Sequence, residues 1–158
     1  NVPGRTSVNM LPATVARLRT FKNIVGIKEA TGDLKQISEL IRLCGRDFDV
    51  ISGDDFTTLP MLAIGGVGAI SVTANIVPGD AAAMFDAFFA GKMEEALRLH
   101  FKMEPLHSLM FIETNPIPVK TALAMMGKIR NELRLPLTTM TEAPAAKLRE
   151  VLTAQGLL

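Results

Sequence analysis

The feature that most constrains the fold is an alternation of short apolar runs with segments of helical periodicity, which continues to residue 91. The strand-like runs are 23–28, 48–52 and 67–73, and the helical segments between and around them are 12–21, 32–44, 55–65 and 78–91. This order is typical of a parallel sheet with helical crossovers. The strand-like runs are rich in Val and Ile without polar alternation, which predicts strands buried on both faces.

The number of strands limits the architecture. Three strands cannot close a barrel of the (β/α)8 class, so the pattern predicts either part of such a barrel or a small open sheet. Beyond Gly91 the strand-like runs stop, and three helical segments follow, at 92–112, 118–127 and 142–156. We therefore expect two domains, an α/β domain over 1–91 and an all-helical domain over 92–158 that serves packing and assembly.

Composition excludes several function classes. The 158 residues carry 17 basic and 16 acidic side chains, a balance that argues against a nucleic-acid surface. No apolar run reaches the roughly 18 residues that a membrane span needs. The single cysteine, Cys44, lies in an apolar helical pattern without an adjoining basic residue, which favours a buried structural thiol over a nucleophile. A lone cysteine also fits a reducing cytoplasm.

A lysine at the end of the first strand-like run is the main candidate for chemistry. In "NIVGIKEATGD", strand parity places Gly26 and Lys28 on one face and Val25, Ile27 and Glu29 on the other, so that Gly26 leaves room for the lysine stem. Catalytic groups of α/β folds gather at the carboxyl ends of strands, and an apolar pocket would lower the amine's pKa from about 10.4 and permit Schiff-base formation. The alternative is a lysine that reaches solvent or pairs with Glu29.

Two loops offer candidate binding residues. In "NVPGRT", Arg5 lies in a turn shaped by Pro3 and Gly4, and its planar guanidinium suits a substrate carboxylate, although most loop arginines are merely solvated. In "SGDD", Gly53 would let a ligand approach the backbone. The two aspartates that follow could cap a helix, and we favour capping for at least one of them.

Two further patterns are weaker. The glycines of "GGVGAIS" precede a strand instead of opening a helix, which indicates a turn and not a phosphate-binding loop. His100, Glu104 and His107 have a spacing that loosely resembles metal ligands, but Pro105 interrupts the helix and no second carboxylate is near. We therefore expect no metal site.

Several motifs together resemble one enzyme family. The segments "NVPGRT", "GIKEATGD", "SGDD", "GAISVTANI" and "NPIPVKTAL" are similar to those of the dihydrodipicolinate (4-hydroxy-tetrahydrodipicolinate) synthases, in the class I aldolase superfamily that includes N-acetylneuraminate lyase. The resemblance spans nearly the whole chain. It implies the C-terminal half of a (β/α)8 TIM barrel followed by an all-helical C-terminal domain, in a cytoplasmic homo-oligomer that is a tetramer or a dimer.

The resemblance also implies roles for individual residues. Lys28 would form a Schiff base with pyruvate, and the resulting enamine would condense with aspartate 4-semialdehyde in lysine biosynthesis through diaminopimelate. Arg5 would bind the carboxylate of the semialdehyde, and Gly53 and Ile70 would line the site through their backbone groups. No metal or organic cofactor takes part in this chemistry.

The sequence departs from the family at its beginning. In the family a tyrosine precedes "NVPGRT" and relays protons with a threonine and a second tyrosine, and these residues belong to an N-terminal half that this chain does not contain. General acid–base help is worth about 10²–10⁴-fold, so we expect the chain alone to be inactive or nearly so. Two alternatives are a sister aldolase such as a sugar-acid lyase, against which Arg5 counts, and a non-catalytic half-barrel that acts as an assembly partner.

Overall fold

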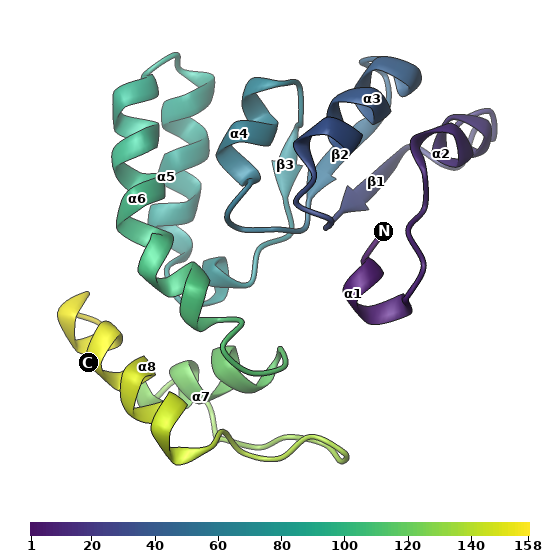
Figure 1. Cartoon of the computed structure of the whole chain (residues 1–158). Coiled ribbons are helices and arrows are strands. Elements are labelled where there is room, and N and C mark those ends of the chain that lie inside the picture. Colours follow the sequence, from purple (N-terminus) through teal and green to yellow (C-terminus); the bar gives the residue numbers. More distant parts are fainter. The chain divides into compact units, whose positions relative to one another are not determined.

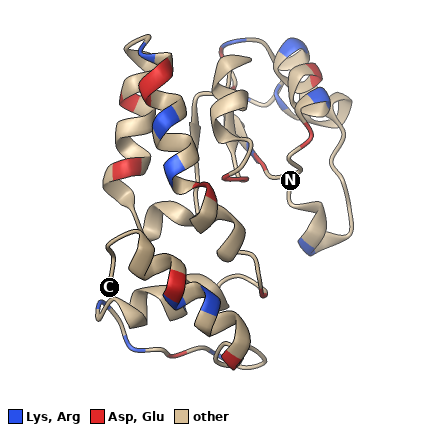
Figure 2. Ribbon diagram, turned by 60° about the vertical axis from the view of Figure 1, so that its left-hand side comes forward, with Lys and Arg blue, Asp and Glu red and all other residues tan.

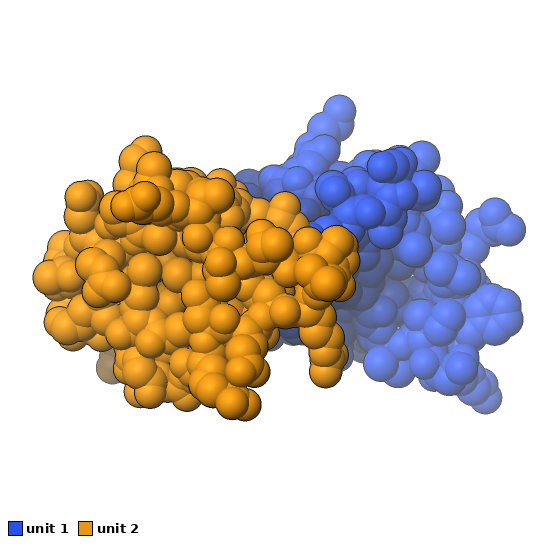
Figure 3. Space-filling view, turned by 90° about the horizontal axis from the view of Figure 1, so that it is seen from below, with its two compact units in different colours: residues 1–71 blue, residues 72–158 orange.

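The computed structural model describes residues 1–158 and divides into two compact units, residues 1–71 (unit 1) and 72–158 (unit 2), which Figure 3 shows in different colours. None of its helices combines the length and the apolar character that a membrane span requires. Each unit has its own secondary structure and its own buried side chains. We describe the units separately.

Unit 1 is an α/β layer built on a parallel sheet of three strands in the order β1-β2-β3 (Figure 1). This confirms the alternation expected from the sequence. The strands are β1 (Gly26–Glu29), β2 (Asp49–Ser52) and β3 (Gly68–Ala69). The helices are α1 (Pro3–Thr6), α2 (Pro12–Leu18), α3 (Leu34–Cys44) and α4 (Thr58–Ala63).

The third strand is much shorter than the predicted 67–73. Only Gly68 and Ala69 pair with β2, opposite Ile51 and Ser52. The apolar run of the sequence continues past the ladder, but its last residue, Thr73, already begins a short 3-10 helix, η1 (Thr73–Asn75). Apolar character alone therefore overestimated the length of this strand.

The core of unit 1 lies between the sheet and its helices. Its buried members are Val15, Ile37, Leu40, Cys44, Phe48, Val50 and Met61. Ile27 of β1 packs against this cluster, which confirms that its face of β1 is covered by helices.

Val25 was expected on the same face but precedes the ladder and is 66% exposed. Cys44 is fully buried, as predicted, and burial raises the pKa of its thiol.

Helix α3 illustrates how local sequence sets the element bounds. The side chain of Asp33 accepts hydrogen bonds from the backbone N–H groups of Lys35 and Gln36 and so caps the first turn. Gly45 ends the helix with a φ of +74°, a conformation that favours glycine. Helix α3 therefore begins where Asp33 satisfies its first amides, at the carboxyl edge of β1.

All regular elements of unit 2 are helices, and they pack in pairs. Besides η1 it contains α5 (Pro78–Phe89), α6 (Met93–Leu109), α7 (Ile117–Met125) and α8 (Glu142–Ala154). Helix α5 packs along α6, and α7 packs against α8. Figure 2, which colours the ribbon by residue type, shows acidic and basic residues interspersed along these helices. The most deeply buried apolar side chains include Ala96, Leu106, Met110, Ala122, Leu148 and Leu152.

The compact units do not follow the expected domains. Helix α5 belongs to unit 2, because it packs along α6, whereas the sequence pattern groups it with the strands that precede it. The compact units divide after Ser71, and the turn at Gly91 lies inside unit 2. The division into domains 1–91 and 92–158 therefore stays a prediction.

Candidate functional site

Lys28 lies on β1 directly beside the end of β2. It is the parallel ladder partner of Ile51, two residues before Gly53. A Cβ atom placed on Gly53 would lie 2.7 Å from Lys28 Cε and 3.1 Å from Lys28 Cγ. The aliphatic stem of the lysine thus passes over the backbone of Gly53, in space that any other residue would fill. The structure therefore brings together two of the four predicted site residues.

The neighbouring glycine, Gly26, has a different role from the one expected. On the same face of β1 as Lys28, it was thought to leave room for the lysine stem. In the structure, a Cβ on Gly26 would lie 2.6 Å from the carbonyl oxygen of Asp49 and 2.9 Å from Asp49 Cβ. Gly26 instead permits the close approach of β2. The glycine that makes room for the lysine comes from the adjacent strand, which strand parity within one segment does not reveal.

Ile70 continues the same edge of the sheet. Its backbone N–H donates to the carbonyl oxygen of Ser52 over 2.8 Å, and the N–H of Gly53 donates to the carbonyl oxygen of Glu29 over 2.8 Å. Ile70 is 54% exposed. These two bonds carry the hydrogen-bond pattern of the sheet one step beyond the strands. Gly53 and Ile70 therefore lie where the carboxyl ends of the three strands meet.

The residues after β2 form a compact polar turn. The hydroxyl of Ser52 donates to the backbone oxygen of Asp54, and the Asp54 carboxylate accepts from the N–H and the hydroxyl of Thr57, at 3.1 and 2.6 Å. Thr57 is the residue that precedes α4. Thr57 is the N-cap residue and makes no side-chain capping bond, so the expected capping of α4 by an aspartate is wrong; Asp54 instead orders the turn before the helix. Its neighbour Asp55 is buried.

Arg5 lies on the single turn of α1, and its side chain is exposed. The segment that carries it is joined to β1 through Asn1, whose nitrogen donates to the carbonyl oxygen of Lys28 over 2.8 Å and whose carbonyl oxygen accepts from the N–H of Ala30 over 3.0 Å. Figure 1 shows α1 beyond the carboxyl end of β1. The Arg5 segment thus begins as an extension of the sheet, on the edge of β1 opposite β2.

Glu29 is the residue whose role the sequence did not reveal. It was considered only as an ion-pair partner of Lys28, yet it is 1% exposed and its carboxylate accepts from Asn1 Nδ2 at 2.9 Å and from the N–H of Thr31 at 2.8 Å. Strand alternation puts it on the face opposite Lys28. The available signal was a charged residue at a core-facing position, which requires hydrogen-bond partners when buried.

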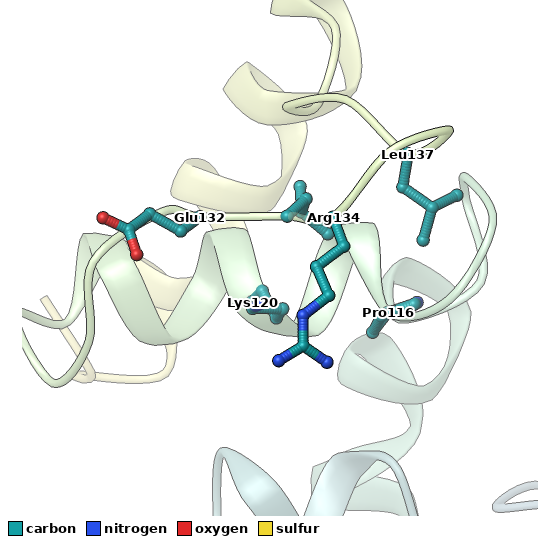
Figure 4. A pocket seen from close by; sticks show the side chains of 6 residues that line it. Pro116, Lys120, Glu132, Arg134 and Leu137 are labelled. Atoms are coloured by element: carbon teal, nitrogen blue, oxygen red, sulfur yellow. The ribbon is translucent and has the colours of Figure 1, made fainter.

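Unit 2 contains a cavity of about 700 Å³ with a mixed charged lining (Figure 4). Its lining residues are Pro116, Lys120, Glu132, Leu133, Arg134 and Leu137. Elsewhere in this unit the Nδ1 atom of buried His107 lies 2.8 Å from the hydroxyl of Thr73, which joins α6 to η1. His100 lies on the preceding turns of α6, and burial lowers its pKa. None of the predicted site residues belongs to unit 2.

Known proteins match the chain over its whole length. The model of the dihydrodipicolinate synthetase family matches residues 1–155. The 4-hydroxy-tetrahydrodipicolinate synthase of Thermodesulfovibrio yellowstonii is 66% identical over 158 residues, which are 100% of this chain and 54% of that protein. The chain thus spans about half the length of the curated relatives it matches.

Solved structures agree with this match. The dihydrodipicolinate synthase of Thermotoga maritima is 48% identical with a TM-score of 0.96, over 100% of this chain and 55% of that one. The chloride-inhibited enzyme of Acinetobacter baumannii, solved in complex with pyruvate, is 42% identical with a TM-score of 0.96, over 100% of this chain and 54% of that one.

Proposed function

The chain belongs to the dihydrodipicolinate synthetase family, and on that premise we propose that it carries the Schiff-base site of a 4-hydroxy-tetrahydrodipicolinate synthase acting in lysine biosynthesis. The observation that supports this most is the passage of the Lys28 stem over Gly53 at the carboxyl edge of a parallel sheet. This edge is where α/β folds collect catalytic groups. The pyruvate complex of the Acinetobacter baumannii relative supports pyruvate as the first substrate.

Lys28 is the proposed nucleophile. Its neutral amine attacks the keto carbon of pyruvate, and loss of water leaves a Schiff base. Loss of a proton from the methyl group then gives an enamine. The enamine carbon attacks the aldehyde carbon of aspartate 4-semialdehyde, and hydrolysis of the Schiff base returns the free lysine. No metal or organic cofactor is needed, because the iminium nitrogen itself accepts the electron pair.

Arg5, Gly53 and Ile70 are the proposed binding residues. The guanidinium of Arg5 can donate two parallel hydrogen bonds to the carboxylate of the semialdehyde. The N–H groups of Gly53 and Ile70 already donate to Glu29 and Ser52. We therefore assign the contacts with substrate at these two residues to their carbonyl oxygens.

The architecture of the parent protein is part of the same proposal. The three parallel strands and their helices would form the C-terminal half of a (β/α)8 barrel, followed by a helical domain, in a cytoplasmic homo-oligomer. The other half of the barrel would supply the proton relay. In support, the chain covers 54% of its relatives' length. We accordingly expect the chain alone to turn over pyruvate and semialdehyde at a small fraction of the rate of a full-length relative.

Trapping with borohydride tests the nucleophile. The chain is incubated with pyruvate and sodium borohydride, which reduces a Schiff base to a stable secondary amine, and the modified residue is located by mass spectrometry. We expect the adduct on Lys28, and its loss in Lys28→Ala. Lys22→Ala is the matched control, because Lys22 is an exposed lysine of the same unit. An adduct spread evenly over the exposed lysines would contradict the proposal, and so would its absence.

A further inference from the structure

We infer that Glu29 is a positioning residue: together with Asn1, Asn9 and Gln36 it fixes both ends of the loop that carries Arg5 relative to Lys28. We call these four side chains the Glu29 network, and residues 2–8 the Arg5 loop. The inference rests on the roles proposed above for Lys28 and Arg5. It adds a residue that does not touch substrate and acts through Arg5.

Each end of the Arg5 loop is bound by the side chain of Asn1. Its Nδ2 donates to Glu29 Oε2 at 2.9 Å and to Asn9 Oδ1 at 2.8 Å, while its Oδ1 accepts from the N–H of Met10 at 2.9 Å. The start of the loop is therefore joined to the chain just after its end. Both hydrogens of the Asn1 amide are used, and one of them connects this closure to the buried carboxylate.

Asn9 and Gln36 complete the network from the side of α3. Asn9 Nδ2 donates to Gln36 Oε1 at 2.8 Å, and Gln36 Nε2 donates to Asn9 Oδ1 at 3.0 Å. Gln36 Nε2 also lies 3.5 Å from Glu29 Oε2. The end of the loop is thus joined to the first turn of α3, which Asp33 caps at the carboxyl edge of β1.

The Arg5 loop has no apolar anchor of its own. None of the residues of α1 is buried, and both Val8, the last residue of the loop, and Leu11, which follows it, are largely exposed. In contrast, α2 begins with buried Pro12 and contains buried Val15. The polar contacts at its two ends therefore determine where the loop lies, since no packed side chain does so.

Glu29 and Lys28 are consecutive residues of β1 and point to opposite faces of the sheet. One peptide unit therefore connects Lys28, which would bind pyruvate, to Glu29, which would orient the Arg5 loop. The carbonyl oxygen of this peptide unit accepts a hydrogen bond from the nitrogen of Asn1. Catalysis and binding lose much of their effect when a group shifts by about 1 Å. Loss of the network should therefore weaken recognition of the substrate carboxylate and leave the amine of Lys28 in place.

The test uses two aldehydes that differ only by a carboxylate, succinic semialdehyde and butanal, each offered to the enamine that pyruvate forms on Lys28. Borohydride, added last, traps the condensed Schiff base on the lysine. The ratio of the two adducts at equal aldehyde concentration measures the preference for the carboxylate. A variant that merely unfolds part of the sample lowers both yields and leaves their ratio unchanged. We expect Arg5→Ala to remove the preference, and Glu29→Ala to lower it by about tenfold.

Three further variants sharpen the result. Asn9→Ala alters an exposed residue of the network, so it should stay folded and lower the ratio as Glu29→Ala does. Glu29→Gln keeps one acceptor oxygen and should give an intermediate ratio. Glu39→Ala removes the same charge from an exposed position of α3 outside the network and should leave the ratio unchanged. Because removal of a negative charge should by itself favour a carboxylate, a fall in the ratio has the opposite sign to a simple charge effect.

The outcomes separate the two proposals. A Lys28 adduct whose ratio falls in Glu29→Ala and Asn9→Ala supports the positioning role. A ratio that stays constant or rises in both variants overturns it and leaves the proposed function intact. A parent chain that forms the Lys28 adduct without preferring the carboxylate contradicts the role of Arg5, and the positioning role with it. A parent chain without a Lys28 adduct contradicts the proposed function itself.

Discussion

Both units of the chain have buried apolar side chains, but they differ in the contacts that leave the least room for change. In unit 1 the critical contacts are close backbone approaches and buried polar groups: Gly26 and Gly53 admit the neighbouring strand and the lysine stem, and Glu29 is buried with its hydrogen-bond partners. In unit 2 they are apolar contacts between helices, such as those of Leu148 and Leu152 on α8. The unit that carries the candidate chemistry is the one that depends on backbone geometry.

This difference predicts where small substitutions should affect activity or stability most. A close approach between backbone atoms leaves no space for even one methyl group, whereas a helix interface can adjust its side chains to a modest change. We therefore expect unit 1 to lose chemistry before it loses its fold, and unit 2 to lose stability in proportion to the apolar volume removed. Four predictions would break or sharpen this contrast.

The largest effect is expected from Gly53→Ala. Its new Cβ would lie 2.7 Å from Lys28 Cε and 2.7 Å from Ala30 Cβ. The flexible lysine stem can move away, but its amine then leaves the site, and Ala30 cannot rotate out of the way. We expect the rate of pyruvate trapping on Lys28 to fall by about 10²-fold. Gly68→Ala is the control, because its Cβ would meet no atom within 4 Å; equal rates in both variants would refute the prediction.

Next comes Leu152→Ala in unit 2. Leu152 is 0% exposed, and truncation of a buried leucine costs about 2–5 kcal/mol of unfolding free energy, since a cavity remains. Urea denaturation followed by circular dichroism measures this loss. The matched control is Leu135→Ala, where the leucine is 86% exposed and should contribute almost nothing. A similar midpoint for both variants would mean that α8 is not packed as described.

The third effect is a pH dependence that originates in unit 2. Burial lowers the pKa of His100 below its ordinary value, and the nearby Glu104 carboxylate opposes that shift. The unfolded chain therefore takes up the proton first as the pH falls below about 6.5, so the unfolding free energy should decrease with acidification. Above that pH the contribution of this histidine is fully present.

Two variants assign this pH dependence to His100. His100→Gln should flatten the part of the stability curve that lies below about pH 6.5. Glu104→Gln removes the group that partly counteracts burial and should make the curve steeper. Thermal unfolding at a series of pH values distinguishes these cases. A curve for His100→Gln that is parallel to that of the parent chain would show that another group is responsible.

The smallest effect is expected for the ion pair between Arg98 and Glu95 on α6. The two side chains are 2.7 Å apart, but both are largely exposed, and solvent weakens such pairs. Attraction to Arg98 lowers the pKa of Glu95, chiefly through a hydrogen bond. We nonetheless expect Glu95→Ala to leave the thermal midpoint at neutral pH unchanged within error. A clear loss of stability would show that surface electrostatics contributes to unit 2 as much as apolar packing.

Local sequence determined the elements of this chain. The spacing of apolar residues predicted the helices, and Asp33 and Gly45 mark the bounds of α3, because caps and left-handed glycines act within a few residues. Strand parity correctly separated Lys28 from Ile27. The helical spacing of apolar residues likewise placed Cys44 in the core. These features need no knowledge of distant residues.

The tertiary structure decided how those elements meet. Only the pairing of β1 with β2 shows that Gly53, and not Gly26, makes room for the Lys28 stem, and only the closure of the Arg5 loop shows why Glu29 can be buried. The short length of β3 and the exposure of Val25 likewise depend on how the strands pair with one another. Periodicity specifies which face of an element is apolar, whereas contacts between distant segments depend on register and approach distance, and these are fixed only when the sheet and its helices pack together.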